Sequence, residues 1–193
     1  TEVDLLAPSV DLFRYSQFAT LGKEMYTLEA SSSTAPFVTG TIGLMLSLNP
    51  CLPIDEVETI LKFSATNIDH IEANQPYKGN YGAGSLHTGR AVKMVYDLYT
   101  ASETAIIENQ KFSRWNFKLT SLSEKVLIQN QQFSGDVVFK LKAKNKIVIG
   151  ENTIIKPNKN GSIILKIDAT IEKQCDLVLR EDFPKNKYYH SNN

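Results

Sequence analysis

The spacing of apolar residues changes near residue 100, and this change limits the folds open to the chain more than any other feature. Between about residues 34 and 100, apolar residues recur at the three- and four-residue intervals of helices. After residue 113 they alternate with lysines and other polar residues, as in strands that have one solvated face. We therefore expect an α/β domain with a parallel sheet over residues 1–100, a linker over 101–112 and a small all-β module over 113–193.

The bulk composition is that of a chain with a packed core. The chain has 193 residues, of which 42% are hydrophobic and 22% charged, and its formal net charge is zero. A neutral chain is not expected to bind nucleic acid or an anionic membrane as its main partner. No apolar run approaches the roughly 20 residues that span a bilayer, so no membrane span is predicted.

The two cysteines, Cys51 and Cys175, lie one in each expected module. Their spacing fits neither a metal site nor a Cys-x-x-Cys redox site. We therefore expect two unpaired thiols, and no cofactor or metal.

The first helix is predicted from Thr34 to Asn49, before Pro50. Its apolar residues cover nearly every face, so we expect a buried central helix, with Gly40 and Gly43 allowing close packing against a neighbouring element. These apolar residues are Phe37, Val38, Ile42, Leu44, Met45, Leu46 and Leu48.

Two further helices are predicted before residue 100. The second begins near Pro53, carries Asp55 and Glu56 in its first turn, and presents one apolar face made of Ile54, Val57, Ile60 and Leu61. The third presents Ala91, Val92, Val95 and Leu98, and His87 is expected to cap its start. Upstream, residues 3–8 are expected to form a short buried strand, and residues 25–28 another within a long loop.

Short alternating segments follow residue 113. Asn160-Gly161 lies between two of them and is expected to form a type I′ hairpin turn. A basic stripe on the outer face is expected to be a solvated surface that protects a sheet edge. The stripe consists of Lys140, Lys142, Lys144 and Lys146.

Three segments of the first half share motifs with one enzyme family. Residues 30–68, "ASSSTAPFVTGTIGLMLSLNPCLPIDEVETILKFSATNI", resemble the nucleophile segment of subtilisin-like serine peptidases (subtilases), whose pattern is Gly-Thr-Ser-Met-Ala-x-Pro-x-Val-Ala-Gly. Residues 3–10, "VDLLAPSV", resemble the family's DVxAPGV strand and loop, and residues 81–92 resemble its YGxGxVNAxxAV segment. The resemblance covers residues 3–95 and implies the C-terminal part of a three-layer subtilase catalytic domain.

Alignment on Pro36, Val38 and Gly40 puts Ser32 at the position of the family nucleophile. The resemblance implies peptide-bond hydrolysis through an acyl-enzyme on Ser32, with the backbone N–H of Ser32 as one oxyanion donor. Ala30 replaces the family's usual glycine before the nucleophile. From the residues alone, a serine in this position is equally a helix cap.

The other catalytic groups of the family are not found in this sequence. The 31 residues before Ser32 contain no histidine or asparagine, and His70, His87 and His190 match no family base position. The resemblance implies that the Asp, the His and the oxyanion Asn lie upstream, in a missing N-terminal half of the domain. We expect this chain to be inactive alone, and the intact protein to be secreted or on the cell surface and to act on polypeptides. Subtilases often bind structural calcium, but this sequence shows no ligand set for it.

The second half resembles the short β repeats near the C-termini of secreted Bacteroidetes proteins, which implies an accessory or surface-attachment module. The segment that carries this resemblance is "NQQFSGDVVFKLKAKNKIVIGENTIIKPNKNGSIILKIDA". The alternative to an enzyme is a non-catalytic adhesion or binding protein built on a degenerate subtilase scaffold.

Overall fold

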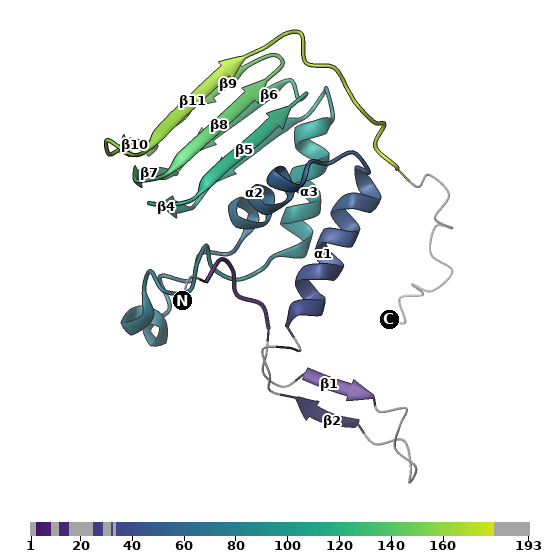
Figure 1. Ribbon diagram of the computed structural model, residues 1–193, viewed down its shortest axis with the longest axis vertical. Helices are drawn as coiled ribbons and strands as arrows, with labels where there is room; N and C mark the ends of the chain where they lie inside the picture. The colour runs from purple at the N-terminus through teal and green to yellow at the C-terminus, as the bar shows by residue number, and fades with distance from the viewer. Residues whose placement is uncertain (1–2, 9–11, 16–24, 29–31, 33, 180–193) are drawn as a thin grey trace, which may run out of the picture.

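The computed structural model describes residues 3–8, 12–15, 25–28, 32 and 34–179. Two short strands, β1 (Leu12–Tyr15) and β2 (Met25–Leu28), form an antiparallel pair below the first helix (Figure 1). The strand expected at residues 25–28 is confirmed. Residues 3–8 contribute one parallel bridge, from Leu6 to Ser85, rather than a strand.

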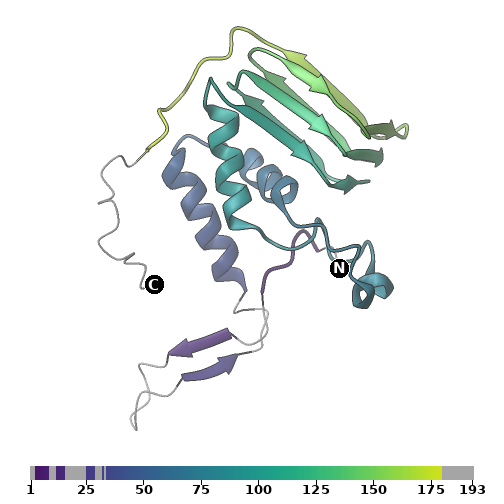
Figure 2. The same cartoon turned by 180° about the vertical axis from the view of Figure 1, so that it is seen from behind.

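Three α-helices follow, and they lie together on one side of the molecule (Figures 1 and 2). They are α1 (Ala35–Leu48), α2 (Ile54–Ser64) and α3 (Thr88–Tyr99). A 3-10 helix, η2 (Glu72–Tyr77), lies in the loop between α2 and α3. α1 packs against α3, and α2 packs against both α3 and the strands.

The second half of the chain winds into three coils, each made of three short strands. Coil 1 consists of β3 (Thr104–Glu108), β4 (Lys111–Phe112) and β5 (Asn116–Ser121). Coil 2 consists of β6 (Lys125–Gln129), β7 (Gln132–Gly135) and β8 (Val138–Ala143). Coil 3 consists of β9 (Ile147–Ile149), β10 (Ile154–Pro157) and β11 (Ser162–Ile167). Equivalent strands pair in parallel, with partners 21 to 24 residues apart, so these strands form a β-solenoid.

Inward-facing side chains stack along the axis of the solenoid. The strand register places Phe133 against Phe112, and Phe139 against Phe117 and Ile163. The inward residues of coils 1 and 2 are almost completely buried. The predicted alternation of apolar inward and polar outward residues is confirmed on β5 and β8, where buried and more exposed residues alternate.

One corner of the solenoid is formed by stacked asparagines. Asn109, Asn130 and Asn152 all have positive φ, a conformation that asparagine tolerates better than most residues. The backbone N–H of Asn109 donates to the carbonyl of Asn130 at 3.0 Å, and the Asn152 side-chain amide donates to Oδ1 of Asn130 at 3.0 Å. Each coil therefore turns at this corner in the same way.

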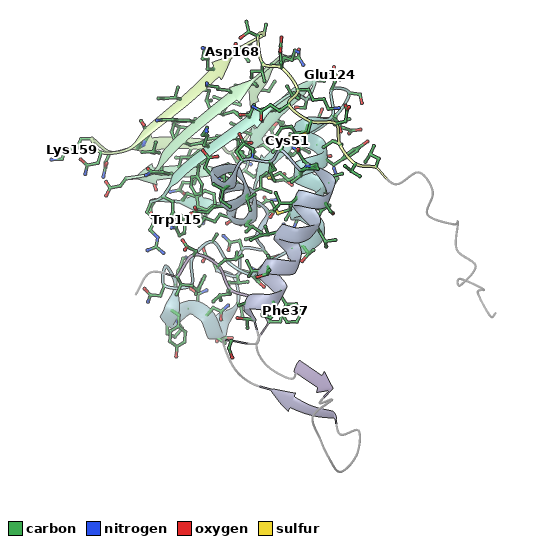
Figure 3. The ribbon with its side chains drawn as sticks, turned by 45° about the vertical axis from the view of Figure 1, so that its right-hand side comes forward. Phe37, Cys51, Trp115, Glu124, Lys159 and Asp168 are labelled. Carbon is green, nitrogen blue, oxygen red and sulfur yellow. A yellow bond between two sulfur atoms is a disulfide. The ribbon has the colours of Figure 1, made fainter. Side chains whose placement is uncertain are left out.

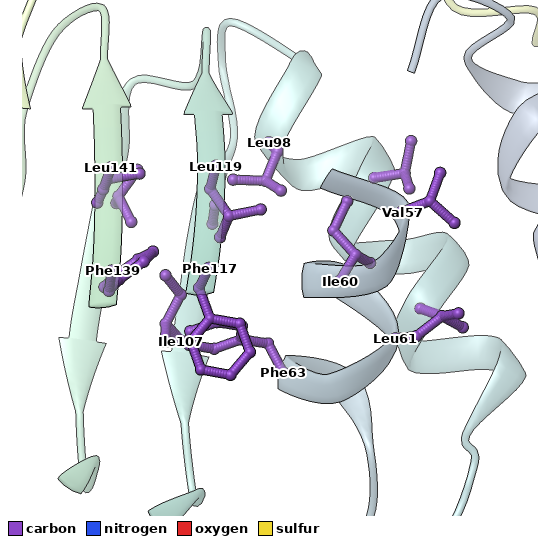
Figure 4. Close-up of a cluster of buried hydrophobic side chains, with 14 of the residues drawn as sticks. Val57, Ile60, Leu61, Phe63, Leu98, Ile107, Phe117, Leu119, Phe139 and Leu141 are labelled. Carbon is purple, nitrogen blue, oxygen red and sulfur yellow. The ribbon is translucent and has the colours of Figure 1, made fainter. Parts of the chain in front are cut away.

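The end of the solenoid at coil 1 is covered by α2. The Phe63 ring lies 5.0 Å from that of Phe112, 4.9 Å from that of Phe117 and 5.2 Å from that of Phe139, measured between centroids. Figure 4 shows Phe63 reaching from the helix to the strand side chains, with Ile60 on the same side of α2. α2 therefore caps the solenoid with its own apolar face.

Helices and strands share one hydrophobic core. The buried cluster runs without a break from Met45 on α1 to Ala143 on β8. The mixed α/β class is confirmed, but the parallel sheets lie in residues 104–167. The described part of residues 1–100, where the parallel sheet was expected, has only the antiparallel pair β1–β2 and isolated bridges. The strands are not set apart as a small all-β module, and residues 104–108, expected within a linker, form β3.

Two expectations about the strands are wrong. Asn160-Gly161 is a solenoid corner rather than a hairpin, because β10 pairs with β7 while β11 pairs with β8. The Asn158 side chain accepts the backbone N–H groups of Asn160 and Gly161 there. Lys140 and Lys142 are solvated, but β8 lies between β5 and β11, so these lysines protect no edge.

The expectation of a buried first helix is also wrong. Only Thr41 and Met45 of α1 are buried, while Leu44 is 52% exposed and Phe37 is 43% exposed. A Cβ added at Gly40 or Gly43 would meet nothing within 4 Å, so the predicted close packing is absent. On α2, Val57, Ile60 and Leu61 are buried as predicted, but Ile54 is 78% exposed because it precedes the turn that faces the strands.

The expectation of two free thiols is wrong as well, because Cys51 and Cys175 form a disulfide (Figure 3). After β11, residues 168–179, which we call the strap, return along the molecule to the helices (Figure 1). The strap is held there by the disulfide and by a hydrogen bond of 2.9 Å from the Val178 N–H to the Leu48 carbonyl. The disulfide thereby joins two positions that are 124 residues apart in the sequence.

Replacement of both cysteines by serine is expected to lower the free energy of unfolding. Closing a loop of this length reduces the entropy of the unfolded chain by an amount worth roughly 4–5 kcal/mol. Urea denaturation of the oxidised protein and of the Cys51→Ser/Cys175→Ser variant measures the difference. Equal midpoints in the two proteins would contradict the assigned role of the disulfide.

Truncation of the capping side chain is expected to be costly. Phe63→Ala should lower the free energy of unfolding by about 3–5 kcal/mol, because it empties a fully enclosed aromatic site. Phe37→Ala on the exposed face of α1 is the matched control, with an expected change within about 0.5 kcal/mol. Similar losses in both variants, measured by chemical denaturation, would show that Phe63 has no special role.

Candidate functional site

Ser32, the residue predicted as a nucleophile, is exposed and lies in a 3-10 turn directly before α1. Pro36 occupies the first turn of the helix, where a missing N–H costs nothing. Ser32 therefore precedes by three residues the end of α1 that carries the positive helix dipole and the free first-turn amides. In the described residues, Ser32 has no hydrogen bond to a histidine or carboxylate that would make its oxygen a nucleophile.

Neither described histidine acts as a base for Ser32. His87 is the N-cap of α3, as predicted, and its Nδ1 accepts the backbone N–H of Arg90 at 3.2 Å. His70 lies in the loop after α2 and lines a surface groove described below. His190 lies outside the described residues.

The segments that carry the family motifs meet in space. Leu6 donates its N–H to Gly84 at 2.8 Å and accepts the N–H of Leu86 at 2.7 Å, and the Ala83 N–H donates to the Asp4 carbonyl at 3.0 Å. The motif at residues 3–8 therefore runs beside the motif at residues 81–92. α1 joins α3 through the hydroxyls of Thr41 and Thr88, 2.7 Å apart.

Two glycines make this contact close enough to form. Gly82 and Gly84 both have positive φ. A Cβ on Gly82 would overlap the backbone of Val3 and Asp4, and one on Gly84 would overlap the Thr66 carbonyl. Gly82 and Gly84 thus allow three chain segments to approach closely.

A buried lysine, which the sequence analysis did not single out, ties the first segment to α2. The Lys62 side chain is 2% exposed, and its Nζ lies 2.9 Å from a carboxylate oxygen of Asp4 and forms a second ion pair with Glu58. The same Nζ lies 4.9 Å from the centroid of the Trp115 ring, over its face. Because a buried ammonium needs a carboxylate partner, Lys62 holds Asp4, and the chain leading to Leu6, against the helix.

A buried carboxyl lies on the opposite side of α2. Glu56 is almost fully enclosed, and its carboxylate accepts the Tyr99 hydroxyl at 2.7 Å. Burial raises the pKa of Glu56 above its usual value, although the hydrogen bond from Tyr99 acts the other way. A cavity of about 80 Å³ adjoins this pair and the disulfide, and the described residues that line it include neither serine nor histidine. We assign Glu56 a structural role, because Tyr99 of α3 is hydrogen-bonded to its carboxylate.

A wide polar groove crosses the asparagine corner of the solenoid. Its volume is about 650 Å³, and residues from the loop after α2, such as Asp69 and His70, face the stacked asparagines across it. The Tyr81 hydroxyl donates to Asp69 at 2.6 Å, and burial followed by this contact raises the pKa of Tyr81 to about 12. Side-chain amides dominate the lining and offer both donors and acceptors. The lining amides are Asn67, Asn109, Gln110, Asn130, Gln131, Gln132 and Asn152.

Within the described residues, no group of three histidine, cysteine or acidic side chains is arranged to hold a metal ion. The helices in that part of the chain are all too short or too polar to cross a bilayer.

Glu56 generates a prediction about pH. The folded state binds the Glu56 proton more tightly than the unfolded state does, so the free energy of unfolding falls as pH rises from about 4.5 through the raised pKa. Glu56→Gln keeps an acceptor for Tyr99 and removes the titration, so the variant should gain stability relative to wild type as pH rises. The steepest slope is about 1.4 kcal/mol per pH unit.

Urea denaturation of both proteins at pH 4, 6 and 8 measures this effect. Glu124→Gln, at an exposed position, is the control and should show no such gain. A stability difference between wild type and Glu56→Gln that stays constant with pH would contradict the prediction.

No protein-family model matches the chain, and neither a curated protein nor a solved structure matches it.

Proposed function

We propose that the chain is part of a secreted or cell-surface serine endopeptidase that hydrolyses peptide bonds through an acyl-enzyme on Ser32. The observation that supports this most is the meeting of the motif segments: residues 3–6 hydrogen-bond to residues 83–86, and α1, which follows Ser32, packs on α3. These segments are far apart in the sequence but adjacent here. The exposed Ser32 at the start of α1 completes the arrangement.

The exposed face of α1 supports the view that a further part of the enzyme is needed. Phe37, Leu44 and Leu46 are exposed on this helix, and Gly40 and Gly43 leave open space beside it. An apolar helix face of this kind is what a neighbouring layer covers. In this proposal the covering polypeptide brings the aspartate, the histidine and the oxyanion asparagine to Ser32, and the chain by itself is inactive.

The disulfide supports the proposed location. Cys51 and Cys175 are bonded to each other, and structural disulfides persist mainly in secreted and cell-surface proteins. Polypeptide is the substrate class, and the preferred substrate residues depend on parts of the enzyme that the family builds upstream of this segment.

A fluorophosphonate probe tests the proposal. The chain extended in frame by its upstream coding sequence should react with the probe at Ser32, because only the complete set of groups makes the hydroxyl nucleophilic. Ser32→Ala should lose the label and several orders of magnitude in peptide hydrolysis. Residues 1–193 alone should not be labelled.

Ser47→Ala is the matched control, because Ser47 is an exposed serine on the same helix with an ordinary hydrogen bond to the Leu44 carbonyl. This variant should keep both labelling and hydrolysis. Labelling of the extended protein that survives Ser32→Ala would exclude Ser32 as the nucleophile.

Binding without catalysis is the second candidate, and the amide-lined groove at the asparagine corner favours it. A protein of this kind would use the solenoid as its working part and the helices as a cap. An extended chain that folds, lacks reaction with the probe and lacks upstream catalytic motifs would support this candidate over the enzyme.

A further inference from the structure

The two ends of the solenoid differ in how well they are covered. At coil 2, the inward-facing Ile128 and Ala143 are 0% and 1% exposed. Their register partners in coil 3, Ile149 and Ile167, are 53% and 49% exposed. The inward positions of coil 3 therefore form an apolar surface at the end of the solenoid, which we call the open end. It consists of Ile147, Ile149, Ile155, Ile163, Leu165 and Ile167.

The open end also carries unpaired backbone. β9, β10 and β11 are each the last strand of their sheet in the described part of the chain. The Ser162 N–H donates to Val137 and the Asp168 N–H donates to Ala143, so even-numbered residues of β11 bond to β8. By the alternation of a strand, Ile163, Leu165 and Ile167 direct their N–H and C=O groups away from β8. These groups can pair with an adjoining strand edge, whereas an apolar contact that excluded water would leave them without hydrogen-bond partners.

The described chain has no segment that covers the open end. The strap leaves β11 and returns to α1, where Cys175 is bonded to Cys51. Within the described residues, the edge of coil 3 therefore has no neighbouring strand.

We propose that the cover is a second copy of this chain, docked end to end through antiparallel pairing of β11 with β11 of the copy. The strands of a coil all run in the same rotational direction around the solenoid axis. In a copy related by a two-fold axis perpendicular to the solenoid axis, the strands run in the opposite direction, so the edge strands of the two copies meet antiparallel. The two apolar open ends face each other across the pair.

The register of this pairing follows from the backbone directions. With the two-fold axis at Ile164, Ile163 of each copy lies opposite Leu165 of the other, and both residues have their free groups toward the interface, so they exchange two hydrogen bonds. The axis pair, Ile164 with Ile164, is then a non-hydrogen-bonded pair, in which side chains lie closest. Ile164 is exposed in the single chain and gains an apolar partner.

The charges of β11 are compatible with this register. Lys166 of one copy lies opposite Ser162 of the other, so no like charges oppose each other in the strand pair. β10 is the less suitable edge, because Pro157 has no N–H and Lys156 points outward, two features that discourage pairing. β11, with six residues and no proline, is therefore the strand that pairs.

Light scattering after size-exclusion chromatography of residues 1–193 tests the proposal. At tens of micromolar the chain should have twice the mass of one copy. Ile164→Lys places two ammonium groups opposite each other at the axis and should raise the dissociation constant at least tenfold (about 1.4 kcal/mol). Because Ile164 points outward on the edge strand, the circular dichroism spectrum at 25 °C should remain that of the wild type, while the melting temperature falls because association no longer stabilises the folded chain.

Leu44→Lys on the exposed face of α1 is the matched control and should leave the dimer intact. A monomer at all concentrations would overturn the proposal. So would a dimer that Leu44→Lys dissociates and Ile164→Lys does not, because it would form through α1.

A crosslink tests the register. Ile164→Cys should give a disulfide-linked dimer on non-reducing gels after mild oxidation, because cross-strand pairs at the axis have Cα atoms at a distance that a disulfide spans. Lys140→Cys is the control, since Lys140 is the register partner of Ile164 on the inner strand β8 and lies one strand further from the interface. Equal crosslinking of the two variants would overturn the β11 pairing.

Discussion

The insertion of Phe63 into the end of coil 1 is the contact on which the rest of the structure depends. A stack of parallel coils leaves apolar side chains and strand edges without partners at each end, so at least one end needs a cover. α2 provides it by placing Phe63 against the rings of Phe112, Phe117 and Phe139. Since α3 packs on α2 and α1 on α3, the position of every helix derives from that cap. The helical half and the solenoid for this reason share one hydrophobic core.

The disulfide and Lys62 hold the parts that the core does not reach. The strap follows β11, the last strand, at one end of the solenoid. Its Cys175 is bonded to Cys51, which precedes α2, the helix that covers the other end. The disulfide therefore joins the two ends of the solenoid outside its core. Lys62 does the same for the segment around Asp4, because its buried ammonium group pairs with the exposed Asp4 carboxylate. Both contacts fasten chain segments that lie outside the solenoid to the helices of the cap.

Local sequence patterns predicted the helices and which strand residues face the core, but they did not predict how the strands pair. The 3.6-residue period of α2 and α3, the acidic first turn of α2 and the His87 cap are local features, and local physics is enough for them. The alternation of apolar and polar residues is the same in parallel and in antiparallel strands, so it does not reveal which strands pair. Asn160-Gly161 therefore suggested a hairpin, although the chain turns a corner of the solenoid there and β11 pairs with β8. The usable signal was the recurrence of Phe112 at Phe133 and of Asn109 at Asn130, each 21 residues on. For Ser32, sequence and structure describe the same turn before a helix, whereas the disulfide joins cysteines too far apart for any local pattern to pair.

The two apolar surfaces left on the molecule differ in what they demand of a partner. The backbone groups in the interior of α1 bond within the helix, so its exposed face around Leu44 needs only apolar contact, and any well-shaped layer can supply it. The open end of coil 3 presents free N–H and C=O groups beside its isoleucines, so its partner must offer a strand edge of matching direction. A further layer of an enzyme can cover the exposed face of α1, and a second copy related by a two-fold axis can pair with the open end of coil 3. The two surfaces lie on opposite sides of the cap, so one molecule can meet both demands at once, and occupation of either leaves the other available.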